Sequence, residues 1–86
     1  MIYLDKFKIA LQHHEKNNLK EAEKLYLNIL KTNPKHSDTL FLLGTLYAQK
    51  KIYDLAIDTI KESIKINNKN ENAFYNLANI YKSLGN

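Results

Sequence analysis

Apolar residues recur at spacings of three and four positions along most of the chain, with polar residues between them. This spacing places apolar side chains on one face of a helix, whereas a half-buried strand would alternate at every second position. Polar stretches interrupt the pattern, and Asn33 with Pro34, and later Gly85, are residues that commonly end helices. The pattern predicts an all-α protein with five helices, which span residues 2–16, 19–32, 37–50, 53–66 and 71–84.

The turns inside the two predicted helix pairs differ in their residues. Asn17 and Asn18 follow the first helix, and asparagine tolerates the left-handed conformation that a tight turn requires. Asn18 with Glu21 three positions later also resembles a capping box for the second helix. Lys51 and Ile52 hold the corresponding places in the second turn, where a left-handed lysine would cost roughly 1 kcal/mol and isoleucine offers no cap. We therefore expect the second turn to be the weaker one.

The order of residue sizes returns after 34 positions, as Ala22 and Ala56 illustrate. Other pairs at this distance are Ile9 and Leu43, Ala10 and Gly44, His13 and Tyr47, and Tyr26 and Ile60, and a third copy begins with Leu77, Ala78 and Tyr81. A period of this length, built from helical spacings, is typical of stacked helix hairpins. The small residues let the two helices of a hairpin approach closely.

Near the carboxyl end, residues 73–86 read AFYNLANIYKSLGN, which closely resembles the first half of a tetratricopeptide repeat. The resemblance extends over the whole chain after Ile2. It implies an α-α superhelix, or solenoid, in a single domain of residues 1–86. Repeat one would span 3–36, repeat two 37–70, and 71–86 would be the first helix of an incomplete third repeat. Lys6 stands where the family has a bulky apolar residue, and Ile29 and Ser63 replace its second alanine.

The resemblance also implies a concave groove, lined by the first helix of each repeat, that takes an extended peptide or a helix. The residues expected to bind a partner there are Phe7, Leu11, His14, Phe41, Leu42, Thr45, Gln49, Tyr75, Asn76 and Asn79, and Leu4 would extend the same face. Apolar side chains exposed on a surface that hairpin packing does not need indicate a binding site. The alternative is that some of them, such as Phe7 and Phe41, pack into the hairpin core.

Two binding modes of the family can be compared with these positions. The carboxylate clamp of some chaperone cofactors grips an acidic C-terminus with lysine, asparagine and arginine, at positions that read here Phe7, Leu11, Leu42, Asn72 and Asn76. Because the cations are missing, we do not expect this chain to bind that ligand. Asn76 and Asn79 instead resemble the asparagine ladder of repeat arrays attached to sugar-transferring enzymes, in which an amide grips the peptide backbone with one donor and one acceptor.

Composition narrows the choice of partner and compartment. The formal charge of +4 comes from lysine alone, and a chain without arginine lacks the planar fork that favours contacts to guanine and phosphate. RNA binding through the lysines therefore remains only a second alternative. The chain has no cysteine, and its amino terminus mixes charged with apolar residues. We expect a cytoplasmic protein without a signal peptide, a membrane span or a disulfide.

The sequence lacks the usual arrangements of catalytic and metal-binding residues. His13, His14 and Glu15 are adjacent on a helix, so their side chains point about 100° apart and cannot converge on one ion. Neither a phosphate-binding glycine loop nor a serine, histidine and acid arrangement is present. We therefore expect no enzyme activity, no metal and no cofactor within these residues.

The sequence favours a protein-protein interaction module that binds a peptide or helix of a partner protein. The first alternative is the amino-terminal array of a larger glycosyl-, sulfo- or methyltransferase that continues beyond residue 86. In the last predicted helix, 71–84, we expect Phe74, Leu77 and Tyr81 to pack back on repeat two. An exposed apolar strip near Ala78, Tyr81 and Leu84 would remain, and we expect self-association through it.

Overall fold

The computed structural model describes residues 2–85, with side chains described from residue 6 onward, and all regular structure in this part of the chain is helical. The helices are α1 (Ile2–Glu15), α2 (Leu19–Thr32), α3 (Ser37–Gln49), α4 (Tyr53–Ile66) and α5 (Glu71–Ser83). The prediction of an all-α protein with five helices is confirmed. α2 and α4 have the predicted bounds, while α1, α3 and α5 each end one residue earlier.

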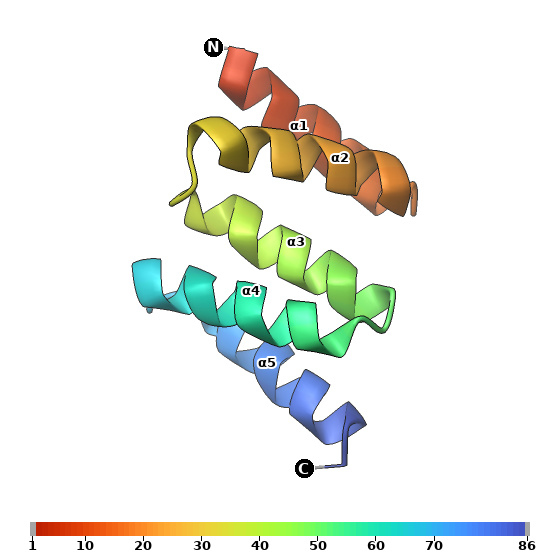
Figure 1. Cartoon of the computed structure of the whole chain (residues 1–86), viewed down its shortest axis with the longest axis vertical. Coiled ribbons are helices and arrows are strands. Elements are labelled where there is room, and N and C mark those ends of the chain that lie inside the picture. Colours follow the sequence, from red (N-terminus) through yellow and green to blue (C-terminus); the bar gives the residue numbers. More distant parts are fainter. Residues whose placement is uncertain (1, 86) are drawn as a thin grey trace.

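The helices stack along one axis, as Figure 1 shows, with α1 at one end of the stack and α5 at the other. The molecule measures 40 × 26 × 18 Å. α1 packs mainly on α2 and α3 mainly on α4, so each pair is a helix hairpin, while α2 with α3 and α4 with α5 make the smaller contacts between units. These are the stacked helix hairpins expected from the 34-residue period, and they form the α-α superhelix that the resemblance implies.

Small residues mark the places where paired helices come closest. Ala10, Ala22 and Ala56 have no exposed surface, and Gly44 is also buried. A Cβ atom placed on Gly44 would lie 2.5 Å from Cγ1 of Ile60 and 3.3 Å from the carbonyl oxygen of Ala56. A larger residue at position 44 would therefore push α3 and α4 apart. The size pattern read from the sequence is the packing pattern of the hairpins.

Each hairpin turn uses one left-handed residue, at Asn17 with φ 63° and at Lys51 with φ 64°. The expected capping box is wrong, because the side chain of Asn18 makes no capping bond to α2. Its Nδ2 instead lies 3.3 Å from Nδ1 of His13, across the turn. Ile52 has no side-chain cap either, as expected. The two turns thus differ mainly in the residue that carries the positive φ.

The junction between the two hairpins is built around His36, which caps α3. Its Nδ1 accepts from the backbone N–H of Thr39 at 3.3 Å and lies 2.6 Å from the hydroxyl of the same residue, which is fully buried. The ring of Phe7 meets the His36 ring edge-on at 5.3 Å. Ser63 adds a second link here, because its buried hydroxyl donates to the carbonyl oxygen of Ser37 at 2.9 Å. This serine, where the family has alanine, thus ties α4 to the start of α3.

Lys6, another departure from the family pattern, lies half-buried on α1. Its ammonium group donates to Oδ1 of Asn28 on α2. The stem of a lysine can cover apolar surface while its charged end stays solvated. Lys6 therefore contributes a polar contact to the first hairpin where the family pattern has apolar packing.

One expectation for α5 is confirmed only in part. Leu77 packs against the core and Tyr81 is half-buried, but Phe74 lies outside the core cluster and leaves 47% of its surface exposed. Phe74 corresponds to Leu40 of α3, which is buried against α4. In α5 the same face has no such cover among the described residues. Ala78 and Leu84 are exposed as well, so the apolar strip is present and Phe74 extends it.

Candidate peptide-binding groove

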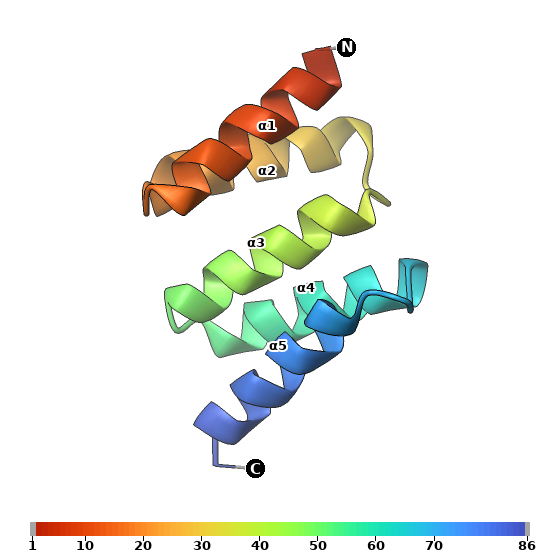
Figure 2. The ribbon, with the colours of Figure 1, turned by 180° about the vertical axis from the view of Figure 1, so that it is seen from behind.

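α1, α3 and α5 form one face of the stack, and α2 and α4 lie behind them in the view of Figure 2. The chain folds this way because α1 pairs with α2, α3 pairs with α4, and α5 packs on the second of these pairs. Groove residues predicted on the first helices are thereby brought to one side of the molecule. Leu4 lies outside the described side chains.

A hollow of about 250 Å³ opens on this face, between α3, the start of α4, and α5. Its lining is Thr45, Ala48, Gln49, Tyr53, Asn76, Asn79, Ile80 and Ser83. The predicted residues Thr45, Gln49, Asn76 and Asn79 thus lie together around one cavity. The hollow also takes in Tyr53, which the sequence reading missed because it considered only the first helix of each repeat.

The amide of Asn76 is oriented by a short chain of hydrogen bonds. Thr45 donates its hydroxyl to the carbonyl oxygen of Phe41 at 2.9 Å and accepts from Nδ2 of Asn76 at 3.1 Å. Oδ1 of Asn76 therefore remains available as an acceptor for a ligand. Within the described residues the amide of Asn79 has no hydrogen-bond partner, so it can offer both a donor and an acceptor to a bound chain.

Gln49 is held from the other side by His14 of α1. Nε2 of His14 lies 2.5 Å from Oε1 of Gln49, and Nδ1 lies 2.8 Å from the hydroxyl of Tyr26. An amide oxygen only accepts, so His14 donates from Nε2 and its Nδ1 accepts from Tyr26. Gln49 is left with its NH₂ group free to donate toward the hollow. These three side chains link α1, α2 and α3, with Gln49 exposed at the groove and Tyr26 fully buried behind it.

Tyr26 is suited to the donor role because it stays protonated. It is fully buried, and burial, followed by the nearby Glu15 carboxylate, raises its pKa above the ordinary tyrosine value. The equivalent position in α4 is Ile60, which has no hydroxyl. The first hairpin therefore contains a polar network that the second one lacks. Burial also raises the pKa of Tyr47, with Glu23 as the second cause.

The predicted apolar groove residues Phe7, Leu11, Phe41 and Leu42 are less exposed than expected. All four are half-buried, and Phe41 and Leu42 pack against the core. Neighbouring segments cover part of this face, as the edge-on contact between the rings of Phe7 and His36 shows. The role of these four residues in binding stays a prediction. Tyr75 of α5, in contrast, is 66% exposed.

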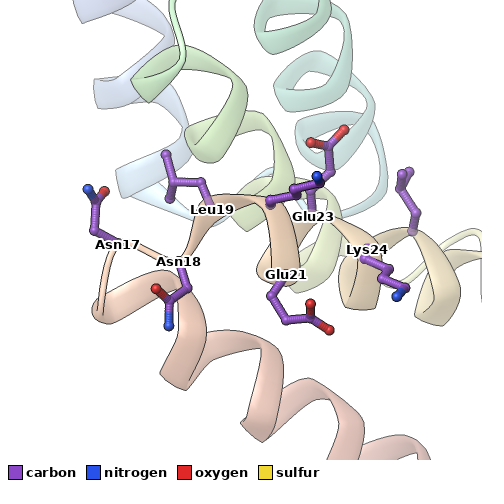
Figure 3. A pocket seen from close by; sticks show the side chains of 8 residues that line it. Asn17, Asn18, Leu19, Glu21, Glu23 and Lys24 are labelled. Carbon is purple, nitrogen blue, oxygen red and sulfur yellow. The ribbon is translucent and has the colours of Figure 1, made fainter.

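A second, wider hollow of about 860 Å³ lies beside the first turn and the start of α2. Figure 3 shows that its side chains diverge: Asn17 and Leu19 point to one side of the chain, and Asn18 and Glu21 to the other. Its lining includes two lysines and two glutamates, Lys20, Glu21, Glu23 and Lys24. This mixture of charges on diverging side chains does not form a site for one ligand.

The described residues give no sign of the other site types that the sequence raised. No three histidine or acidic side chains among them gather closely enough to hold a metal ion. His13 turns to Asn18, while His14 turns to Tyr26 and Gln49, so the two histidines diverge as expected. None of the helices in the described part is both long and apolar enough to cross a membrane.

Comparison with known proteins shows the family to which the chain belongs. Residues 4–86 match the model of a family described as anaphase-promoting complex, cyclosome, subunit 3. Two solved structures of a tetratricopeptide repeat domain protein from Salinibacter ruber also resemble the chain. The crystal structure has a TM-score of 0.71 at 23% identity, and the solution NMR structure 0.70 at 25%. Each covers 94% of this chain, which in turn covers 89% and 81% of the two structures. The chain belongs to this family of tetratricopeptide repeat proteins.

Curated relatives of this tetratricopeptide repeat chain are long proteins. One is a probable UDP-N-acetylglucosamine-peptide N-acetylglucosaminyltransferase of Arabidopsis thaliana, 29% identical over 94% of this chain. Another is the UDP-N-acetylglucosamine-peptide N-acetylglucosaminyltransferase of Caenorhabditis elegans, 31% identical over 90% of this chain. The tetratricopeptide repeats described above correspond to only 8% and 7% of these relatives.

Proposed function

We propose that the chain is a protein-interaction module that binds an extended segment of a partner protein along the face of α1, α3 and α5, without catalysis or cofactor. The observation that carries the proposal is the hollow lined by Thr45, Gln49, Asn76 and Asn79. Its amides come from two helices, and each has a donor or an acceptor to spare. An extended peptide presents one N–H and one C=O per residue, so such amides can hold its backbone whatever its sequence.

The residues around the hollow are suited to an uncharged stretch of extended peptide rather than to a charged group. Ala48 and Ile80 give its lining apolar contacts, and it contains neither lysine nor a carboxylate. Tyr75 on the exposed side of α5 offers a large aromatic surface for a partner side chain. A cytoplasmic location is part of this proposal, since it suits a chain without cysteine.

A fluorescent peptide library, read by anisotropy against the 86-residue chain, tests the proposal. For the peptides that bind, Asn79→Ala should weaken binding about tenfold, because a lost hydrogen bond in a desolvated site is worth on the order of 1–2 kcal/mol. Asn68→Ala is the matched control, because Asn68 is exposed in the connection between α4 and α5. Equal effects of the two substitutions would argue against the hollow as the binding site.

A second candidate function is suggested by the relatives named as N-acetylglucosaminyltransferases. We propose as the alternative that these repeats present acceptor peptides to a glycosyltransferase. On this view the chain binds acceptor peptides of such enzymes in the same groove and transfers no sugar by itself. Equal binding of peptides with acceptor serines and of scrambled peptides would count against this alternative. The proposal of a general protein-interaction module would not be affected by that result.

A further inference from the structure

The apolar strip of α5 consists of Phe74, Leu77, Ala78, Tyr81 and Leu84. Phe74 and Leu84 leave 47% and 43% of their surface exposed, Ala78 is exposed, and the other two are half-buried. Their spacing of three and four residues puts them on one side of the helix. A strip of this kind on a soluble protein usually binds another surface.

The shape of the strip is that of a helix-pairing face. Four of its residues correspond, 34 positions on, to Leu40, Leu43, Gly44 and Tyr47 of α3. That face of α3 is buried where α4 packs on it. Ala78 takes the place of Gly44, so α5 keeps a small residue at the point where two helix axes come closest. The occupant that fits this face is another helix.

Charges beside the strip indicate which helix it is. Glu71 and Lys82 are both exposed and lie 11 positions apart, which is about three turns, so they flank the strip on the same side. Neither side chain belongs to an ion pair among the described residues. The ion pair in that part of the chain joins Lys50 and Glu23. One end of the flank is therefore acidic and the other basic.

We propose that α5 binds α5 of a second copy of this chain, antiparallel, about a two-fold axis. In this arrangement Glu71 of each copy lies beside Lys82 of the other, and the contact is made twice. A parallel two-fold pair would put the charged flanks of the two copies on opposite sides of the contact, so Glu71 of one copy would not meet Lys82 of the other. The midpoint between positions 71 and 82 falls next to Leu77 and close to Ala78, so the charges and the small residue place the axis at the same point.

The interface is small, since each copy contributes one face of a helix of 13 residues. Small interfaces are typical of weak and transient complexes. The dimer should therefore form with rising concentration rather than persist on dilution.

Phe74 of one copy would lie near Tyr81 of the other and supply an aromatic contact across the axis. The peptide-binding hollow stays open, because Asn79 lies off the strip.

Sedimentation velocity of the 86-residue chain over a concentration series tests the proposal. The chain should shift from monomer to dimer, and Ala78→Glu should weaken the dimer at least tenfold. Asn79→Glu is the matched control, because it adds the same charge one residue further on, outside the strip. Far-UV circular dichroism checks that both variants keep their helices.

Charge variants test the orientation. Glu71→Lys and Lys82→Glu should each weaken self-association, because each places like charges together in the antiparallel pair. The two variants mixed in equal amounts should associate again, since each copy then meets its opposite charge. A chain that stays monomeric near 1 mM, as it would if the strip serves a different partner helix, would overturn the proposal. Single variants that dimerise as well as the unchanged chain would overturn the antiparallel arrangement.

Discussion

The burial of an individual side chain in this protein depends on the neighbouring hairpin that packs against it. Phe41 illustrates the point, because its place on the first helix of repeat two suggested a free groove residue, yet it is half-buried against the core. Tyr75 stands at the corresponding place on α5 and is 66% exposed. Two aromatic residues at the same repeat position thus differ in burial.

Replacing Phe41 with serine should lower the free energy of unfolding by about 2 kcal/mol, because a partly buried aromatic loses packing contacts. Chemical denaturation measures the change. Tyr75→Ser is the matched control and should change stability by less than about 0.5 kcal/mol. If Phe41→Ser leaves stability unchanged but abolishes peptide binding, Phe41 belongs to the groove alone.

Tyr26 should make the protein lose stability at alkaline pH. Its pKa is raised by burial, so folding favours the protonated form, and this stabilisation is complete below the ordinary tyrosine pKa of about 10 and lost as pH rises above it. Denaturation between pH 8 and 11 measures the slope. Tyr26→Phe loses the bond to His14 at all pH values, but its stability should fall less steeply above pH 10. Parallel slopes for the two proteins would contradict the assignment.

At the scale of the helices, turns and caps decide where each one begins and ends. The Lys51 turn carries a lysine at φ 64°, where the first turn has an asparagine. Lys51→Gly should raise the free energy of unfolding by about 0.5–1 kcal/mol, because glycine adopts this conformation without a Cβ clash. Lys50→Gly, at φ −85°, is the control and should destabilise the protein. Adding Ile52→Asn should contribute little, because Asn18 at the corresponding place does not cap its helix.

The cap of α3 is the second prediction at this scale. His36→Ala should cost about 1–2 kcal/mol, because it leaves the N–H and the buried hydroxyl of Thr39 without the imidazole acceptor. His36→Asn should recover much of this loss, since asparagine also caps helices well. Thermal denaturation of the three proteins gives the order. An alanine variant as stable as the original would show that the junction between the hairpins does not depend on this cap.

The whole molecule is a stack in which each hairpin touches only its neighbours. α3 contacts helices on both sides, whereas α5 contacts the rest of the stack on one side. Because stability in such arrays comes from neighbour contacts, amide hydrogen exchange should be slowest in α3 and α4 and faster in α5. Exchange measured by mass spectrometry at low protein concentration tests this order. Protection of α5 equal to that of α3 would require cover that the described contacts lack.

Much of the fold could be predicted because its causes are local. The helices follow from apolar spacing, and the left-handed turn residues follow from the short connections that Asn17 and Lys51 must close. The 34-residue period placed Ala22 and Gly44 at close contacts, because only small residues fit where two helices meet. The resemblance to tetratricopeptide repeats placed Thr45, Gln49, Asn76 and Asn79 on one face, and all four line the hollow.

Only the tertiary structure decided which of these side chains are covered. Phe74 was expected to be packed and is exposed, while Phe41 was expected to be free and is half-buried. The share of Tyr53 in the hollow and the turn of Asn18 toward His13 also arise from segments that meet only in the folded stack. A helix period specifies on which side a residue lies. Burial depends on which side chains the neighbouring helix places against that side, and on the distance between the two helices. The local pattern contains neither.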